Sequence, residues 1–317
     1  MDTTALRIKW RAIHHRSSMH VTFTRSSCKL LVCSTTQKKG RANSLFQSSI
    51  FEFRNTLENI MTSLTPGLCL PGYASHFGIA NIPFGIASSQ QHPTPQCVTR
   101  FEDTVIFLAD ISSLQEEEEL KNALPPNIFS QPTLNAFAAL PRTTHRAVRT
   151  HLQTLLKSPG IPDSALEPLS SIRMHLPVRS GDFTDFSCSA DHVLNASEAM
   201  TGARSHPPSF YHQPVGYAGR CSSLDVSGSA QERPLGQFWA GKPGESEVVF
   251  GASRRMDFEL EVGVIVGRAV GRRERVGVRE AGESVFGFVL VNDWSGELAF
   301  SSWRVPDSSL GFLLLLM

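Results

Sequence analysis

The sequence predicts a mixed, β-rich fold of two domains that follow a leader. Hydrophobic residues make up 41% of the 317 residues, which is enough for a sizeable core. Residues 76–173 combine short β-type runs with a helical stretch, whereas strand-like runs alternate with Gly and Pro turns from residue 174 onward. Such alternation, with few helical patterns, favours a β-rich domain over a repeating βαβ unit.

The leader covers residues 1–75. Its first 50 residues hold nine Lys or Arg and a single acid, Asp2, with no regular strand or helix period. Three interpretations are an organelle transit peptide, a nucleic-acid-binding arm, and a disordered or mis-predicted extension. We favour the last, with Met61 as an alternative start, because ordered-looking sequence begins near His76.

The domain at 76–173 is predicted to be small and mixed. Residues 77–86 and 97–108 are expected to form short strands, separated by a loop rich in Gln, His and Pro. Residues 134–156 have helical spacing, but Pro141 interrupts it, so we expect two shorter helices. Nothing in this domain gathers catalytic side chains.

The domain at 174–317 holds the chemistry. Strands are expected at 214–217, 224–228, 256–266 and 285–294, and residues 181–186 are interpreted as a turn that holds acids on a loop. Neither a Gly-x-Gly-x-x-Gly pattern nor a P-loop occurs, so nucleotide binding has no support.

Acids alternate along the strand expected at 256–266. Side chains of a strand point to opposite faces in turn, so Asp257, Glu259 and Glu261 share one face. One interpretation is an amphipathic edge strand with a solvated acidic face. The run continues into Val264, Ile265 and Val266, however, which indicates burial on both faces nearby. Buried carboxylates repel one another unless a hard cation such as Mg²⁺ or Ca²⁺ compensates them.

Two further residues are candidates for the same site. Asp293 ends the apolar strand expected at 285–294, where it is either a turn residue or part of a site built on a rigid strand. His192 follows Asp185 by seven residues. It is either an ordinary polar residue or a general base beside a metal carboxylate.

Five motifs, in order, resemble the fumarylacetoacetase family. They are residues 181–186 with the following His192, then 214–220, 233–237, 257–261 and 291–295. Residues 81–85 and 131–135 also resemble the N-terminal domain of that family. The resemblance therefore covers about residues 76–295.

This resemblance implies a small SH3-like N-terminal barrel followed by a β-rich catalytic domain that is incomplete here. It implies metal-dependent hydrolysis of 4-fumarylacetoacetate to fumarate and acetoacetate, the last step of tyrosine degradation. The implied metal ligands, for Mg²⁺ and/or Ca²⁺, are Asp185, Glu259, Glu261 and Asp293. His192 would be the general base and Tyr217 a substrate contact. Ser187 stands where the family has a substrate-contacting Tyr.

The resemblance weakens in two places. An Arg expected after the base is not matched, and Arg204 is only a neighbour of its position. After Ser295 the family continues Ala-Arg-Asp-Ile-Gln, whereas this chain reads differently and stops at Met317. We expect a truncated domain with impaired turnover, because the family's oxyanion-stabilising Lys lies in the missing region. A frameshift or mis-predicted splice near Ser295 would explain the change.

Composition sets the remaining expectations. The net charge of +1 implies no bulk attraction to nucleic acid or membrane. Six scattered cysteines without Cys-x2-Cys spacing indicate a reduced compartment, so we expect a cytoplasmic protein. The expected partner is a small-molecule diketo acid, with a homodimer for the intact family member. Alternatives are a related acylpyruvase or decarboxylase, and a non-catalytic metal-binding fragment.

Overall fold

The structure is a computed structural model of the chain. It describes residues 74–296 except 159, 213–214, 242–244 and 255, together with the backbone of three earlier strands. These strands are β1 (Leu6–Ala12), β2 (His15–Val21) and β3 (Lys29–Thr35). The sequence pattern of the leader indicated none of them. The expected disorder or mis-prediction of the leader concerns residues that otherwise lie outside the described part of the chain.

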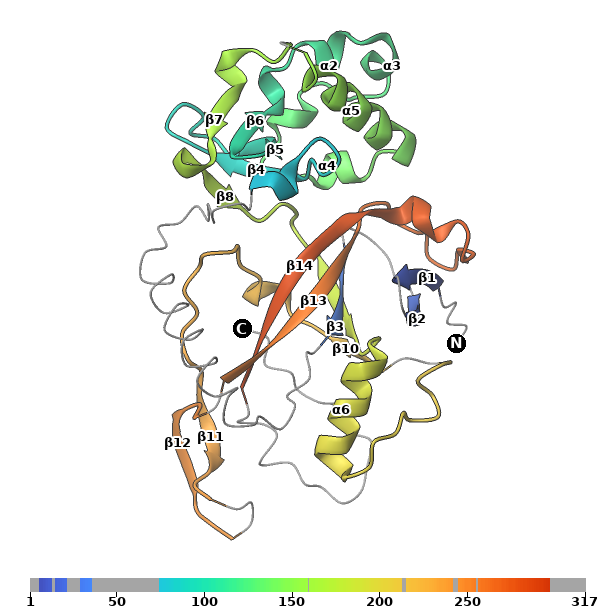
Figure 1. Cartoon of the computed structure of the whole chain (residues 1–317), viewed down its shortest axis with the longest axis vertical. Helices are drawn as coiled ribbons and strands as arrows, with labels where there is room; N and C mark the ends of the chain where they lie inside the picture. Colours follow the sequence, from blue (N-terminus) through green and yellow to red (C-terminus); the bar gives the residue numbers. More distant parts are fainter. Residues whose placement is uncertain are drawn as a thin grey trace. The chain divides into compact units, whose positions relative to one another are not determined.

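The chain divides into two compact units. Figure 1 shows the N-terminal unit in cyan to yellow-green, and the C-terminal unit in yellow to red together with the blue strands β1 to β3. The N-terminal unit ends at Arg179 and also includes Asp225–Gly228. The C-terminal unit contains Ser180–Leu224, the residues from Ser229 onward, and β1 to β3.

The N-terminal unit is built on a five-stranded antiparallel sheet in the order β7-β6-β5-β4-β8. Its strands are β4 (Phe84–Ser88), β5 (Gln96–Phe101), β6 (Thr104–Phe107), β7 (Leu166–Pro168) and β8 (Arg173–His175). The α-helices are α2 (Ser113–Glu116), α3 (Glu118–Lys121), α4 (Asn135–Ala138) and α5 (Arg142–Leu155). Short 3-10 turns are η1 (Ala74–Phe77), η2 (Leu108–Asp110), η3 (Ile128–Ser130), η4 (Asp163–Ala165) and η5 (Leu169–Ser171).

The predicted break at Pro141 is confirmed, since α4 ends before it and α5 begins after it. The strand prediction for 77–86 holds only for its last residues, because η1 occupies Phe77 and β4 begins at Phe84. Residues 97–108 form a hairpin rather than one run. The turn falls at Glu102, whose φ of 50° reverses the chain.

The C-terminal unit is organised around a second five-stranded sheet, in the order β10-β9-β3-β13-β14. The strands are β9 (Asp182–Phe186), β10 (Gly216–Ala218), β13 (Met256–Val266) and β14 (Val285–Gly296), with β3 as the middle strand. Only β3 and β9 pair in parallel. The expected strand at 256–266 is confirmed, and β14 extends two residues past the predicted end at 294.

Three expectations for this unit are wrong or incomplete. Residues 182–186 of the expected turn form strand β9 rather than a loop, because β9 pairs with β3 and β10 on its two sides. Residues 224–228 form no strand: the Asp225 carboxylate accepts the N–H of Val226, and Gly228 has a φ of 94°. The seven-residue spacing from Asp185 to His192 suits a helix after β9, and α6 (Ala190–Thr201) is found there. No pattern in the sequence predicted the hairpin of β11 (Leu235–Trp239) and β12 (Val248–Ala252).

Strand β13 buries an acidic side chain and exposes apolar ones, which is the reverse of the usual arrangement in a sheet. It lies between β3 and β14, so it is not an edge strand. Glu261 is buried, whereas Phe258 and Leu260 are 58% and 53% exposed. The interpretation of a solvated acidic face is therefore wrong. The expected burial at Val264, Ile265 and Val266 is confirmed.

The β-rich class is confirmed by these sheets and by the small helical content of the C-terminal unit. Between residues 74 and 296, and in the other positions that the structure describes, no helix has the length and apolar content to cross a membrane.

Candidate metal centre

Three acids from three different strands converge inside the C-terminal unit. Asp185 lies on β9, Glu261 on β13 and Asp293 on β14, and one carboxylate oxygen of each lies within 4.8 Å of those of the other two. The three residues are 6%, 1% and 3% exposed, respectively. A strand pair alone could not produce this arrangement, because β3 separates β9 from β13 in the sheet.

The position of Asp185 depends on the packing of β9. Phe183 and Asp185 are two residues apart, so both point to the buried face of the strand. The N–H of Gly219 donates to the Phe183 carbonyl, and a Cβ at Gly219 would lie 1.9 Å from the Phe183 ring. Glycine at 219 therefore lets the chain after β10 cross directly over the ring that anchors β9.

Several oxygens of the cluster lack protein partners. Asp185 Oδ1 and both carboxylate oxygens of Asp293 are buried without a hydrogen bond. Buried polar atoms are nearly always hydrogen-bonded, and an exception needs a physical explanation. A hard divalent cation would supply it, because Mg²⁺ and Ca²⁺ take carboxylate oxygens as ligands. The donor set therefore fits such an ion.

The raised pKa values of Asp185 and Asp293 also indicate a cation site. Burial, and then the charge of Glu259, raise the pKa of Asp185 to about 6, while a hydrogen bond from the Phe186 N–H opposes the shift. Burial, with the charges of Glu259 and Asp185, raises the pKa of Asp293 to about 7. Such carboxyls are held in an environment that penalises their negative charge, which a cation would reverse.

Glu259, the fourth acid that the sequence singled out, lies beside the three-acid cluster. It is half-buried and is the Cα partner of Asp293 across the β13–β14 ladder. Its charge acts on both Asp185 and Asp293, so it belongs to the same electrostatic site.

Tyr217 and Ser187 meet at the edge of this site. Tyr217 on β10 is the Cα partner of Asp185, and its side chain is hydrogen-bonded to that of Ser187. Burial raises the pKa of Tyr217, the bond to Ser187 opposes this, and the charges of Asp185 and Glu259 raise it further. The hydroxyl of Tyr217 therefore stays protonated at neutral pH.

His192 lies in the first turn of α6. Ser189 caps this helix by accepting the backbone N–H of His192 with its hydroxyl, 3.3 Å away. His192 and Asp185 are thus joined by the short link between β9 and α6. Arg204 does not fill the role of the missing arginine, since its guanidinium donates to Asn195 and Glu198 on an exposed surface.

Two family models match the chain in succession. The model described as Fumarylacetoacetase N-terminal matches residues 80–177, and the model described as Fumarylacetoacetate (FAA) hydrolase C-terminal matches residues 182–306. The second match includes all seven candidate site residues.

Curated proteins give the same result. Fumarylacetoacetase fahA of Aspergillus fumigatus is 37% identical over 235 residues, which cover 70% of this chain and 54% of that protein. The fumarylacetoacetases of Rattus norvegicus and Caenorhabditis elegans are 36% and 37% identical over 231 residues, with the same coverage of 70% and 54%. The chain therefore spans about half the length of the curated relatives that it matches.

Proposed function

The chain belongs to the fumarylacetoacetase family, and we propose from this premise that it carries the metal centre of a hydrolase that cleaves 4-fumarylacetoacetate into fumarate and acetoacetate. One observation carries the proposal: Asp185, Glu261 and Asp293 gather their carboxylates in a buried position. Such a cluster is costly without a cation and is explained by one.

The ion would be Mg²⁺ or Ca²⁺, held by Asp185, Glu261 and Asp293, with Glu259 as the fourth ligand. When bound, it would supply Lewis-acid chemistry toward the two oxygens of a β-diketone. The chain's own contribution is to hold four carboxylates on three strands.

The proton chemistry falls to His192. A ring nitrogen of His192 would take a proton from water, whose oxygen joins the carbonyl carbon that becomes a fumarate carboxylate. The carbon–carbon bond then breaks, its electron pair leaves with the acetoacetate carbon, and that carbon regains a proton. One water is consumed. Tyr217, oriented by its bond to Ser187, would contact the substrate.

The finer architecture forms part of the same proposal. The domains would be an SH3-like barrel at 76–173 and a catalytic domain at 174–317, after a leader at 1–75. The partner would be a small diketo acid rather than nucleic acid or membrane, with a homodimer for the intact protein in the cytoplasm.

Two measurements on the full chain test the proposal. Titration calorimetry with Mg²⁺ and Ca²⁺ should detect binding that Glu261→Gln abolishes, while Glu232→Gln, which removes an exposed acid, should bind as the parent does. A spectrophotometric assay with fumarylacetoacetate should show turnover. His192→Gln should lose that turnover and keep metal binding, whereas His212→Gln, at an exposed position, should keep both.

The outcomes separate the alternatives. Metal binding with His192-dependent turnover supports the hydrolase. Metal binding without any turnover favours the non-catalytic metal-binding alternative for this chain. Absence of metal binding in the folded protein would overturn the proposed centre.

A further inference from the structure

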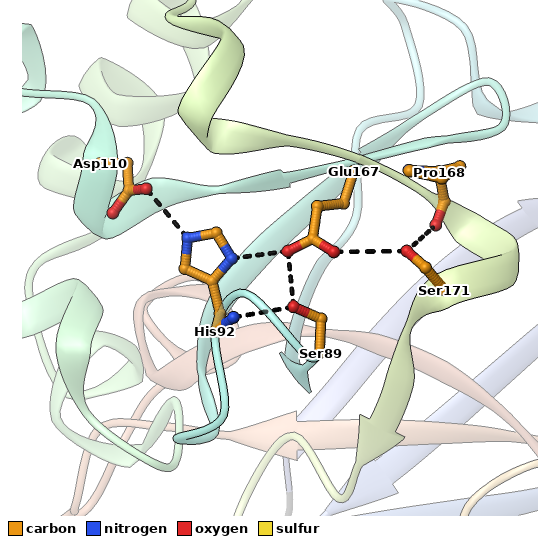
Figure 2. A network of polar contacts seen from close by, with 6 residues as sticks. All are labelled: Ser89, His92, Asp110, Glu167, Pro168 and Ser171. Atoms are coloured by element: carbon orange, nitrogen blue, oxygen red, sulfur yellow. Dashed lines mark hydrogen bonds and ion pairs between the residues drawn. The ribbon is translucent and has the colours of Figure 1, made fainter.

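A second polar cluster lies in the N-terminal unit, centred on His92 in the loop between β4 and β5 (Figure 2). The His92 Nδ1 atom lies 2.6 Å from Glu167 Oε1, and its Nε2 atom lies 2.9 Å from Asp110 Oδ2. The side chains of His92, Asp110 and Glu167 are 12%, 30% and 5% exposed, respectively. The imidazole therefore bridges two carboxylates from separate elements, η2 and β7.

The two contacts require a particular protonation state. Each carboxylate offers only acceptors when it is ionised, so both ring nitrogens must donate. Only the imidazolium has two N–H groups. A neutral imidazole would turn one nitrogen lone pair toward a carboxylate oxygen and would leave that acid without its donor.

The surroundings keep the bridging geometry fixed. The His92 ring stacks on Phe107 of β6, with centroids 3.8 Å apart and an interplanar angle of 13°. The Ser89 hydroxyl donates to Glu167 Oε1 over 2.6 Å, and it accepts the backbone N–H of His92 over 2.9 Å. The Ser171 hydroxyl lies 2.8 Å from the Pro168 carbonyl and 3.3 Å from Glu167 Oε2, and it shares its one proton between these two acceptors. The carboxylate of Glu167 therefore contacts three side chains, those of His92, Ser89 and Ser171 (Figure 2).

We propose that His92 is a protonation-dependent latch, which holds loop 89–95 against β7 and η2 as an imidazolium and releases the loop when the imidazolium loses its proton. The latch joins segments that are far apart in sequence, since Glu167 lies 75 residues beyond His92. The anchored segment is short. Apart from the two carboxylate contacts of His92, it is held by the hydrogen bond from the Ser89 N–H to the His92 carbonyl, by the Ser89 hydroxyl bond to Glu167 and by the stacking of His92 on Phe107.

The direction of the pH effect follows from the shifts. Burial lowers the pKa of His92, but the hydrogen bonds and charges of Asp110 and Glu167 outweigh it, so the net shift is upward from 6.5. A group whose pKa is higher in the folded than in the unfolded protein stabilises the folded state. This stabilisation is complete below the pKa of the unfolded state and is lost as pH rises through the pKa of the folded state. The pKa of Glu167 is lowered despite its burial, by Ser89, His92 and Ser171, so acid opens the latch only below about pH 4.5.

The pKa values of two other histidines of this unit, His145 and His175, shift in the direction opposite to that of His92. The charged groups that act on His92 are Asp110 from η2 and Glu167 from β7, whereas β6 contributes the Phe107 ring. His175, bonded to Ser88, has its pKa lowered by burial and by Arg173. His145 has its pKa lowered by burial, against its bond to the Phe137 carbonyl. Both therefore favour folding as pH rises, which is opposite to the effect of His92.

Nuclear magnetic resonance on the full chain tests the latch. The His92 ring resonances should titrate with a midpoint above 6.5, and Asp110→Asn should lower that midpoint. Amide hydrogen exchange of the non-proline residues in 89–95, corrected for intrinsic rates, should show protection that falls at least about tenfold between pH 6 and pH 9, the change expected for one pKa unit.

Two variants complete the test. His92→Gln can still donate one hydrogen bond but cannot carry the charge, so its loop should exchange fast at every pH. His175→Gln should retain the pH-dependent protection of the parent. A His92 midpoint at or below 6.5 in the parent protein would overturn the proposal, and this measurement does not depend on whether any variant folds. Loop protection that is independent of pH in the parent would overturn it as well.

Discussion

Glu259 on β13 and Asp293 on β14 are direct Cα partners in an antiparallel ladder, so two carboxylates occupy the same rung. Like charges placed opposite each other in a sheet are destabilising. After burial, Glu259 is the largest contributor to the raised pKa of Asp293. Repulsion between these carboxylates therefore destabilises the sheet. Protonation, a bound cation or removal of one charge should each relieve that repulsion.

The first prediction concerns pH. Asp185 and Asp293 have pKa values raised to about 6 and about 7. The folded state therefore binds more protons than the unfolded state above pH 4, and stability should fall as pH rises from 4 to 7. For Asp185, a rise from 3.8 to about 6 costs on the order of 3 kcal/mol at about 1.4 kcal/mol per unit.

Tryptophan fluorescence can follow this unfolding selectively, because residues 74–179 contain no tryptophan, whereas Trp239 and Trp294 lie on β11 and β14 of the C-terminal unit. Urea midpoints in EDTA should be higher at pH 5 than at pH 7.5. Excess Ca²⁺ or Mg²⁺ should remove the difference. An equal midpoint at both pH values in EDTA would contradict the expectation.

The second prediction concerns Asp293→Asn. This substitution removes one buried charge from the rung that it shares with Glu259. In EDTA at pH 7.5 the variant should be more stable than the parent protein, because a neutral amide is less costly to bury than a carboxylate. It should also lose the stabilisation by Ca²⁺. Thermal unfolding with and without the cation measures both effects, and Glu232→Gln serves as an exposed control.

A third prediction addresses the core of the N-terminal unit. Phe137 is fully buried and makes edge-to-face contacts with Phe84 and Phe129, with centroids 5.2 and 5.5 Å away. Phe137→Ala should destabilise this unit by about 3–5 kcal/mol, through lost burial and the cavity that remains. Hydrogen exchange in α5 measures the loss. Leu176→Ala, at an exposed position, should have little effect.

The fourth prediction concerns the close contact between the backbone of Gly219 and the ring of Phe183. Gly219→Ala would place a methyl group 1.9 Å from the ring, so the strand must shift or the ring must leave. We expect loss of the β9–β10 pairing and of metal binding. Gly287→Ala on β14 is the matched control, because nothing lies within 4 Å of its added Cβ. Rescue of Gly219→Ala by Phe183→Leu would identify the clash as the cause.

The fifth prediction concerns solubility. Phe258 and Leu260 on β13, with Phe288 and Leu290 on β14, are all exposed, and Leu290 is 75% exposed. β14 is also the last strand of its sheet among the described residues. Apolar edges of this kind promote association, so we expect the chain to associate at high concentration. Leu290→Lys should reduce light scattering without changing the fluorescence midpoint, and unchanged scattering would count against this explanation.

Local patterns predicted part of this fold. Strand β13 and most of β14 could be predicted because long β-branched and apolar runs specify a strand in nearly any context. The break at Pro141 could be predicted because proline cannot continue a helix. Asp185, Glu259, Glu261 and Asp293 were singled out by the order of family motifs, since periodicity alone left each with an ordinary interpretation.

The remaining features depend on partners that are distant in sequence. Residues 181–186 have the composition of a turn, yet pairing with β3 and β10 makes residues 182–186 a strand. Nothing near Asp185 in sequence indicates that β3, some 150 residues earlier, lies beside it. The burial of Glu261 could not be read from β13 itself, because alternation tells which residues share a face but not which face is covered.

The reversed faces of β13 have a consequence for protein engineering. A redesign protocol that scores residues by hydropathy would exchange the inward-facing Glu261 for an aliphatic residue and the outward-facing Phe258 for a charged one. The first exchange would raise thermal tolerance while removing a ligand of the proposed metal centre, and the second would leave that centre intact. Stabilised versions of this chain should therefore be selected with position 261 held fixed and position 258 allowed to vary.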